Sequence, residues 1–343
     1  MQSLERASNR HVSQRDSILE RLIRLLLGLW RDFDRWDDEQ VVAGMAARSA
    51  MLVNSAIAQT RRTERSYLTA LFTSADLDVS AMPAVVDSYP RANTYPSEVY
   101  ARPVEAFIWA RRNGGTLAES KEQFEQRLRQ IAEADMLAAE REEAQRAYVS
   151  QAKVIGYRRV VHPEKAKSGL SCGLCIVAAT RIYRTDELMG LHNGCNCDTA
   201  PITAASDPGK ALNDNDLAEI YNAAGGTDAG SLLNTRVSYR DHGELGPVLV
   251  KDGDHFRTPE EAGRPKFERS TPETRRAAAN AELAHLTEQI GEAQSRYDLL
   301  VTEDPTTLLP NSSHSDERVA LFRSIKYMRE LAAALEVHLA RAA

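Results

Sequence analysis

The sequence lacks an apolar run of the roughly 18 to 20 residues that a membrane-spanning helix needs. Residues 22–30 form an apolar run near the N-terminus, but Arg24 interrupts it and no small-residue cleavage site follows. We therefore expect neither a membrane span nor a secretory signal. Aromatic residues make up only 6% of the chain, whereas alanine, arginine, glutamate and leucine are abundant, which favours helices. The net charge of −6 argues against a protein that coats nucleic acid throughout.

Cysteine is scarce as well, and all four cysteines lie between positions 172 and 197. A C-x-x-C pair is followed by an H-x-x-C-x-C group, and this spacing is typical of a structural zinc site. We predict one structural zinc ion per chain. Five residues compete for the four places around it: Cys172, Cys175, His192, Cys195 and Cys197. Cys172, Cys175 and Cys197 are expected in every set, and the fourth ligand is His192 or Cys195. If Cys195 is the fourth ligand, all four cysteines bind the metal and His192 lies beside it.

Two other arrangements of the cysteines are weighed against zinc. Four is an even number, so two disulfides are an alternative, and unbonded thiols are another. The lack of a secretory signal argues against disulfides, and a chain of 343 residues builds a core without covalent cross-links. A catalytic zinc is disfavoured because no H-E-x-x-H motif is present and no glutamate follows His192 at the spacing of zinc deaminases.

The first 150 residues carry helical patterns. Apolar side chains recur at helical spacing up to residue 72, on a stripe broad enough to bury against other helices. We interpret residues 1–103 as an N-terminal helical bundle that ends in a proline-rich linker, because dense proline stops helices. Helical periodicity returns at Val104, and residues 104–150 are predicted to form charged helices. The alternation of acidic and basic residues there is typical of a solvated helix face.

The rest of the chain divides into three segments. Residues 151–203 begin with a strand pattern at 154–161 and contain the cysteines, so we predict a small α+β zinc-knuckle module whose metal supplies folding free energy. Residues 204–270 are loop-rich with short strands, one of them at 248–250. Residues 271–343 carry two apolar stripes joined by a Pro/Ser turn, which predicts an antiparallel helical hairpin. The expected fold class is mainly α with a small α+β zinc-knuckle module, an N-terminal helical bundle and a C-terminal antiparallel helical hairpin.

The cysteine-rich segment resembles the phage Mu F-like minor head proteins, in the versions found in actinobacterial phages. That family combines a C-x-x-C pair, a tyrosine, an H-x-x-C-x-C group and a nearby proline. Here Tyr183 follows Cys175 by eight residues, and Pro201 follows Cys197 by four. The usual arginine between the last two cysteines is Asn196. The resemblance covers roughly residues 15–257, with weaker matches at Val99, Arg102, Pro103, Trp109 and residues 242–247.

The resemblance implies a minor structural protein of a tailed-phage head that acts in head morphogenesis. Such a protein is expected in the virion, in the head interior at the portal vertex, and in the host cytoplasm during assembly. Its implied partners are the portal protein and the major capsid or scaffold protein. The family's metal motif carries over onto Cys172, Cys175, His192, Cys195 and Cys197.

An enzymatic function is the alternative, namely a capsid maturation protease that acts on scaffold or capsid protein. Residue types for a catalytic triad are present at Ser168, Ser171, His162, Asp241 and His242. None of the serines lies in a G-x-S-x-G elbow, and we expect His162, which precedes a proline in a basic loop, at the surface. We therefore assign no catalytic residue.

A basic stretch precedes the cysteines and suggests a further partner. Residues 151–170 could contact packaged DNA through Lys153, Arg158, Arg159, Lys165 and Lys167. The stretch is a local patch on an acidic chain, so we expect DNA contact as a secondary property rather than as the main function.

Overall fold

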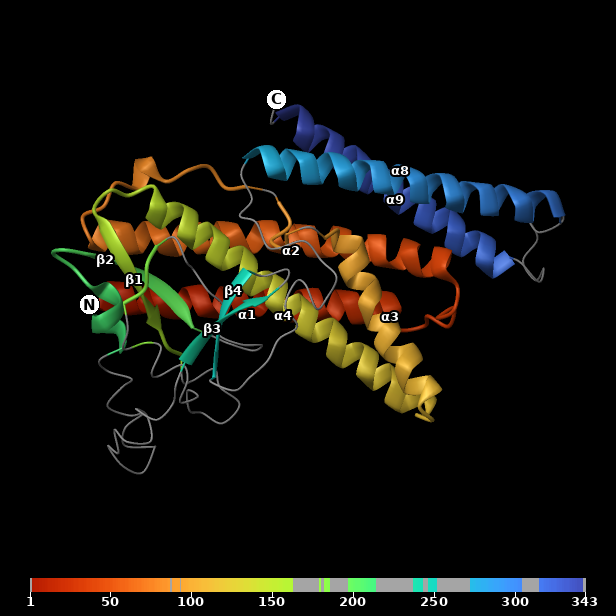
Figure 1. Cartoon of the computed structure of the whole chain (residues 1–343), viewed down its shortest axis with the longest axis horizontal. Coiled ribbons are helices and arrows are strands. Elements are labelled where there is room, and N and C mark those ends of the chain that lie inside the picture. Colours follow the sequence, from red (N-terminus) through yellow and green to blue (C-terminus); the bar gives the residue numbers. More distant parts are fainter. Residues whose placement is uncertain are drawn as a thin grey trace.

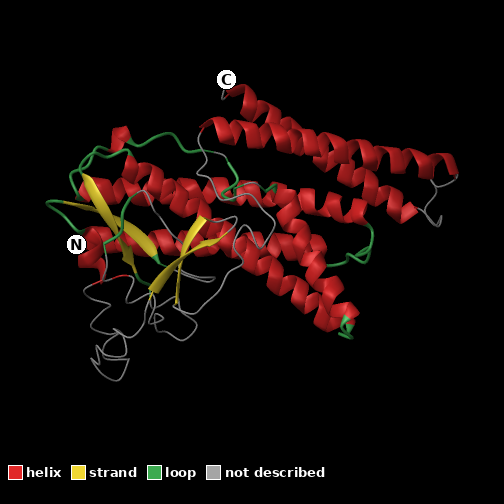
Figure 2. Ribbon diagram, viewed as in Figure 1, coloured by secondary structure: helices red, strands yellow, loops and turns green. Residues whose placement is uncertain are grey.

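The structure is a computed structural model that describes most of the chain. The described residues are 2–86, 88–92, 94–162, 179, 182–185, 197–213, 237–242, 246–251, 272–303 and 315–341. Long helices make up the body of the protein, so the mainly helical class is confirmed (Figures 1 and 2). The helices of the N-terminal part are α1 (Gln2–Trp30), α2 (Glu39–Ser74), α3 (Pro96–Arg112) and α4 (Leu117–Val149).

Local sequence explains where two of these helices begin. Asp38 caps α2, because its carboxylate accepts a hydrogen bond from the backbone N–H of Val41 at 3.2 Å. Thr116 and Glu119 form a capping box at the start of α4, in which each side chain accepts a hydrogen bond from the backbone N–H of the other residue. These caps satisfy backbone donors that a helix leaves without intrahelical partners.

An apolar core joins the N-terminal helices. Aromatic rings from the end of α1 and from the connection to α2 meet rings of α3 and α4: Trp30, Phe33, Trp36, Phe107 and Phe124. The stripe that the sequence predicts over residues 18–33 is thus buried against other helices of the same chain, as expected for a bundle. Leu25, which is 50% exposed, is an exception.

The start of α3 differs from the prediction. Helical structure was expected from Val104, but α3 begins at Pro96 and contains Pro103 in its interior. Pro96 occupies the first turn, where a helix does not need the missing N–H. Pro103 is tolerated because α3 packs between α2 and α4, with Val99 and Tyr100 completely buried. The proposed boundary at residue 103 therefore falls inside a helix.

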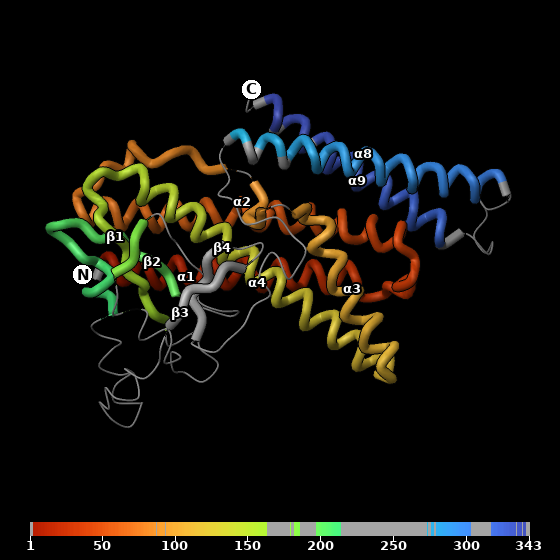
Figure 3. The backbone as a smooth tube through the Cα atoms, in the orientation of Figure 1, coloured from red at the N-terminus to blue at the C-terminus, as the bar shows by residue number. Residues whose placement is uncertain are grey.

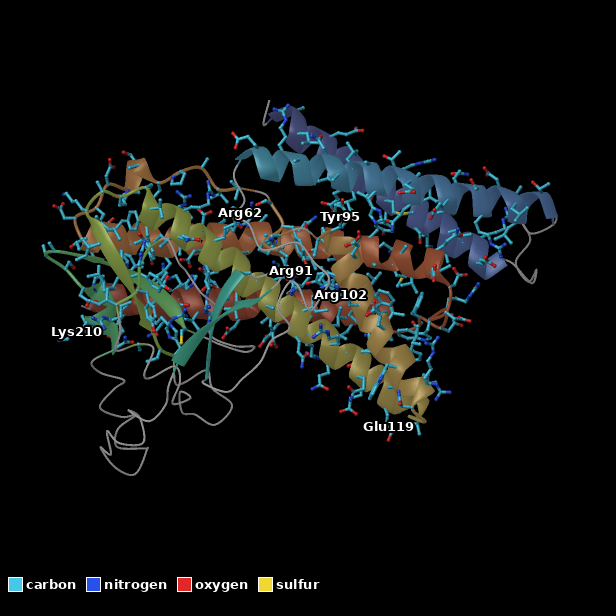
Figure 4. All side chains as sticks on the ribbon, in the orientation of Figure 1. Arg62, Arg91, Tyr95, Arg102, Glu119 and Lys210 are labelled. Carbon is cyan, nitrogen blue, oxygen red and sulfur yellow. The ribbon has the colours of Figure 1, made fainter. Side chains whose placement is uncertain are left out.

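The proline-rich linker before α3 is fastened to the helices by side chains. Arg61 of α2 donates hydrogen bonds to the backbone carbonyls of Val86 and Ser88, at 2.7 and 2.6 Å. Arg91 donates to Asp135 of α4 at 2.5 Å (Figure 4 labels Arg91). A buried backbone outside helices and strands needs such donors for its carbonyls.

Two small antiparallel sheets follow α4. The first pairs β1 (Val154–Val160) with β2 (Asp198–Thr203), and the second pairs β3 (Val237–His242) with β4 (Gly246–Lys251). The strands predicted at 154–161 and 248–250 are thereby confirmed. The β1–β2 sheet shares a core with the ends of α2 and α4.

Tyr157, in the middle of β1, has a neighbour on each edge. Pro201 of β2 lies opposite it on one side, and on the other side Tyr157 and Tyr183 exchange two backbone hydrogen bonds of 2.9 Å each. The rings of the two tyrosines stack with centroids 5.2 Å apart. Gly156 permits this approach, because a Cβ at that position would meet the Tyr183 carbonyl oxygen at 2.8 Å.

The C-terminal segment forms the predicted antiparallel helical hairpin. Its helices α8 (Pro272–Glu303) and α9 (Ser315–Arg341) run in opposite directions along one side of α2 (Figure 3). Leu286, Leu321 and Met328 pack on Ala47 and Ala50 of α2 in a separate core. The hairpin therefore finds its apolar partner within the same chain.

Gly44 of α2 lies directly against Ser324 of α9, which predicts a sensitive position. A methyl group on Gly44 would overlap the buried side chain of Ser324. We expect Gly44→Ala to destabilise the protein by about 1 to 3 kcal/mol through overpacking. Gly28→Ala is the matched control, since nothing lies within 4 Å of a Cβ there. It should stabilise by about 0.5 to 1 kcal/mol, because alanine is the better helix former. Thermal unfolding measures both, and equal effects would contradict the packing.

The sequence led us to expect no membrane-spanning helix, but α2 is long and apolar enough to cross a membrane by length and composition. An 18-residue window within it passes that test, but 61% of the window is buried inside the chain. A helix at the centre of a folded core meets the same criteria, and α2 contributes side chains to the three apolar cores described above. Its apolar character is thus accounted for by packing.

Candidate functional site

The predicted zinc ligands lie mostly outside the described residues. Cys172, Cys175, His192 and Cys195 fall there, so their arrangement stays a prediction. Cys197 is buried in the core that contains Tyr157 and Tyr183. Its backbone carbonyl accepts a hydrogen bond from Nη2 of Arg141 at 3.2 Å. The end of the cysteine-rich segment is therefore anchored on α4.

Ionisable side chains are buried together close to Cys197. They lie where the first part of α1 runs beside the β1–β2 sheet, as the backbone shows (Figure 3). We term this group the buried polar cluster. Its members come from three helices, from β2 and from the residues after β1: His11 and Arg15 (α1), Glu64 (α2), Glu140 (α4), His162 and Asp198 (β2). Each is at most 8% exposed.

Carboxylates surround His11. Its Nε2 lies 3.1 Å from Oε2 of Glu64, 3.8 Å from Oε2 of Glu140 and 3.7 Å from Oδ1 of Asp198. The imidazole stacks on the ring of Tyr67, with centroids 4.6 Å apart and an interplanar angle of 12°. The stack fixes the plane of the imidazole, so its Nε2 edge stays directed at the carboxylates.

Two other basic side chains hold Asp198. Nη1 of Arg15 donates to Oδ1 of Asp198 at 2.6 Å and to Oε1 of Glu140 at 3.3 Å. Nε2 of His162 lies 3.0 Å from Oδ2 of Asp198. Arg15 therefore links β2 to α4, and both oxygens of Asp198 have charge-assisted contacts.

Burial and mutual charge shift the protonation of the cluster in opposite directions. Burial alone would lower the pKa of His11, but Asp198 and Glu64 outweigh it and raise that pKa to about 9. Burial raises the pKa of Glu64 well above its usual value, against the opposing effect of His11. Burial would also raise the pKa of Asp198, yet His11 and Arg15 hold it below the usual range. Asp198 is therefore ionised, whereas Glu64 retains its proton more readily.

Three members of the cluster could hold a metal ion. One ligand atom each from His11, Glu64 and Glu140 lies within 4.8 Å of the other two. Imidazole nitrogen and carboxylate oxygen are common ligands of first-row transition metals. This group is far in sequence from the cysteines, where metal binding was predicted.

The surface position expected for His162 is wrong. The side chain is buried and paired with Asp198, because Val161 and His162, which follow β1 directly, lie in the interior. Of the other triad candidates, Ser168 and Ser171 lie outside the described residues. Asp241 and His242 end β3, and only their backbone is described.

The basic patch predicted for DNA contact is only partly available at the surface. Arg159 is completely buried, with its guanidinium over the ring of Tyr183, so it cannot reach DNA. Arg158 binds Asp207 in a two-point contact, with N···O distances of 3.1 and 2.7 Å. Lys153 is exposed, 4.0 Å from a carboxylate oxygen of Asp76. Lys165 and Lys167 lie outside the described residues.

Sequence analysis missed His11, Glu64 and Glu140. The alternating charges of α4 were interpreted as a solvated face, which is wrong for its second half, where Glu140 and Glu143 are buried. Such buried charged residues can be recognised in a sequence when they occupy helix positions at which the periodicity predicts an apolar residue. Glu64 is an example, because it precedes Tyr67 and Leu68 on the buried side of α2.

Comparison with known proteins assigns neither a family nor a function to this chain. A scan against protein-family models, a search of curated proteins and a search of solved structures each find no match to this chain.

Proposed function

We propose that this chain is a minor structural protein of a tailed-phage head, bound near the portal and acting in head morphogenesis. The observation that carries the proposal is the C-x-x-C…H-x-x-C-x-C segment with Tyr183 and Pro201 at the family's spacing. The packing supports it, because these two residues flank Tyr157 on opposite edges of β1. The non-ligand residues of the motif would then serve to place the cysteine-rich segment on the sheet.

The same segment would hold one structural zinc ion, bound by four of Cys172, Cys175, His192, Cys195 and Cys197. We expect purified, reduced protein loaded with Co²⁺ in place of zinc to show the intense near-ultraviolet band of thiolate-bound cobalt. Cys172→Ser with Cys175→Ser should remove that band. The two changes should also loosen residues 151–203, because a structural metal supplies folding free energy. Wild-type protein without the band would contradict a thiolate site.

In this role the protein would lie in the head interior at the portal vertex and in the host cytoplasm during assembly. Its partners would be the portal protein and the major capsid or scaffold protein. The apolar stripe of α1 is buried within the chain, so portal contact requires another surface. Trp109 of α3 is a candidate, since it is 66% exposed and exposed tryptophans often anchor interfaces.

Co-expression of the full-length chain with portal, scaffold and major capsid proteins tests the proposal. We expect the chain to co-purify with portal and to be found in assembled heads. Trp109→Ala should weaken retention by portal at least tenfold, as loss of an interface anchor does. Phe322→Ala is the matched control, a 58% exposed aromatic on the hairpin and outside the resembling residues. Heads that assemble without the chain, and portal that never retains it, would refute the function.

A capsid maturation protease is a second candidate, favoured by the contact of His162 with Asp198 at 3.0 Å. A general base and its orienting carboxylate make such a contact. The same co-expression measures it through cleavage of scaffold or capsid protein. We expect processing to be unchanged in His162→Ala, Ser168→Ala and Ser171→Ala. Cleavage that occurs with wild type and is lost in one of these variants, at normal solubility, would favour the protease.

A further inference from the structure

We propose that His11, Glu64 and Glu140 form a buried binding site for a divalent transition-metal ion, separate from the cysteine-rich motif. The three buried side chains come from α1, α2 and α4 and converge in the interior. Helical bundles build metal sites in this way, from inward-facing histidine and glutamate side chains on facing helices. The inference does not depend on the function proposed above.

The donor atoms are spaced much as in a coordination shell. An ion bonded at about 2.1 Å holds its donors roughly 3 to 4 Å apart. Nε2 of His11 lies 3.1 Å from Oε2 of Glu64 and 3.8 Å from Oε2 of Glu140. All three donor atoms fall within 4.8 Å of one another, so small side-chain rotations suffice to bring them onto one ion.

Two of the donor atoms have ion-pair contacts but lack a well-formed hydrogen bond. Among the described residues, Nε2 of His11 and Oε2 of Glu140 make no hydrogen bond of acceptable geometry. Their side chains are only 1% and 4% exposed, so bulk water does not satisfy them. Buried polar atoms in this condition are costly to the fold. One metal ion between the two atoms would satisfy both.

The charges of the site also fit a divalent cation. Arg15 and His162 already engage Asp198, so we place Asp198 beside the metal shell rather than in it. A bound ion displaces the protons of its ligands, so Glu64, Glu140 and Asp198 would then carry three negative charges together. With both histidines neutral, Arg15 and a divalent ion carry three positive charges, and the buried group is electrically neutral. Neutrality is what a buried ionic group requires.

The donor set selects the class of metal. One imidazole nitrogen with two carboxylates suits Zn²⁺, Mn²⁺ or Fe²⁺, whereas Ca²⁺ and Mg²⁺ prefer shells made of oxygen. An ion here would fasten α1 to α2 and α4, next to the point where β2 leaves the cysteine-rich segment. The ion is therefore expected to stabilise the folded protein and to keep α1 attached to α2 and α4.

Metal content of the full-length protein tests the site. The protein is loaded with Zn²⁺ and dialysed against metal-free buffer, and the ions per chain are counted. Glu64→Gln and Glu140→Gln should each lose one ion relative to wild type, whether or not the cysteines hold another. Glu143→Gln is the matched control, because Glu143 is a fully buried glutamate of α4 that pairs with Arg65. It should keep the wild-type content.

Loading with Co²⁺ separates this site from the cysteines. Glu64→Gln should lose one cobalt ion while the thiolate band stays unchanged. Melting temperatures distinguish metal loss from misfolding: metal-free Glu64→Gln should melt close to metal-free wild type, because a neutral amide replaces a carboxyl group whose pKa burial already raises. Added Zn²⁺ should raise the Tm of wild type and of Glu143→Gln more than that of Glu64→Gln. Equal metal content in wild type, Glu64→Gln and Glu140→Gln would overturn the proposal.

Discussion

Replacing Asp135 by alanine is expected to lower the free energy of unfolding by about 3 to 5 kcal/mol, the cost of breaking a buried ion pair. Asp135 lies on α4 with no exposed surface. Its carboxylate accepts hydrogen bonds from Nε of Arg91 at 2.5 Å, from the hydroxyl of Tyr89 at 2.8 Å and from that of Tyr100 at 3.0 Å. Alanine would remove the acceptor for all three and release the linker from α4.

Thermal or urea unfolding, followed by far-ultraviolet circular dichroism, measures this loss. Tyr100→Phe is the graded control, since it deletes one hydrogen bond and should cost about 1 kcal/mol. Limited proteolysis should cut the Asp135→Ala variant faster within residues 83–92, where the linker follows the helices. A loss no larger than that of Tyr100→Phe would show that Asp135 does not hold the linker.

The hairpin is expected to dock more firmly at pH 5 than at pH 8, by up to about 3 kcal/mol. Glu282 of α8 is buried, and burial, followed by the charge of Glu98, raises its pKa from 4.5 to about 7. Between pH 4.5 and about pH 7, Glu282 therefore keeps its proton in the folded protein and loses it in the unfolded chain. The contribution of Glu282 to the stability of the docked hairpin is greatest below about pH 4.5. It falls as pH rises and levels off above about pH 7.

Two glutamine substitutions on α8 isolate this effect. Glu282→Gln should remove the pH dependence and stabilise the hairpin at pH 8, because the amide carries no charge to bury. Glu288→Gln, at an exposed position on the same helix, should leave the dependence intact. Protease release of the hairpin as a function of pH is the measurement. A pH profile that is the same in wild type and Glu282→Gln would assign the dependence to another group.

Local patterns in the sequence were enough to predict most of the helices and two of the strands. The stripe in α1 and the hairpin repeats both depend on local patterns, and the structure has them. The start of α3 was not predictable in this way. Proline disfavours a helix locally, and the burial of Tyr100 that overrides this preference is a tertiary effect.

The buried polar cluster was also beyond local patterns. His11, Glu64 and Asp198 are far apart in sequence. Glutamate and aspartate are mostly surface residues, and histidine is intermediate, so none of the three by itself indicates a buried position. Their proximity follows from the way α1, α2 and β2 meet, which no spacing rule encodes. The cysteine motif is the opposite case, since its metal assignment rests on local spacing alone. It stays a prediction, because only Cys197 among its proposed ligands lies in the described part of the chain.

The position of α2 has a consequence for how the nascent chain matures on the ribosome. This helix ends at Ser74, whereas the hairpin that covers one of its faces begins at Pro272, so that face is made long before its partner. Surfaces left uncovered during synthesis invite aggregation. Until then this face of α2 presents mainly small residues, Ala47, Ala50 and Gly44, with Met51 as its one large apolar side chain in that core. Small side chains expose little apolar area to other chains, so this face should aggregate weakly. The same small side chains allow α9 to pack closely on α2 once it has been synthesised.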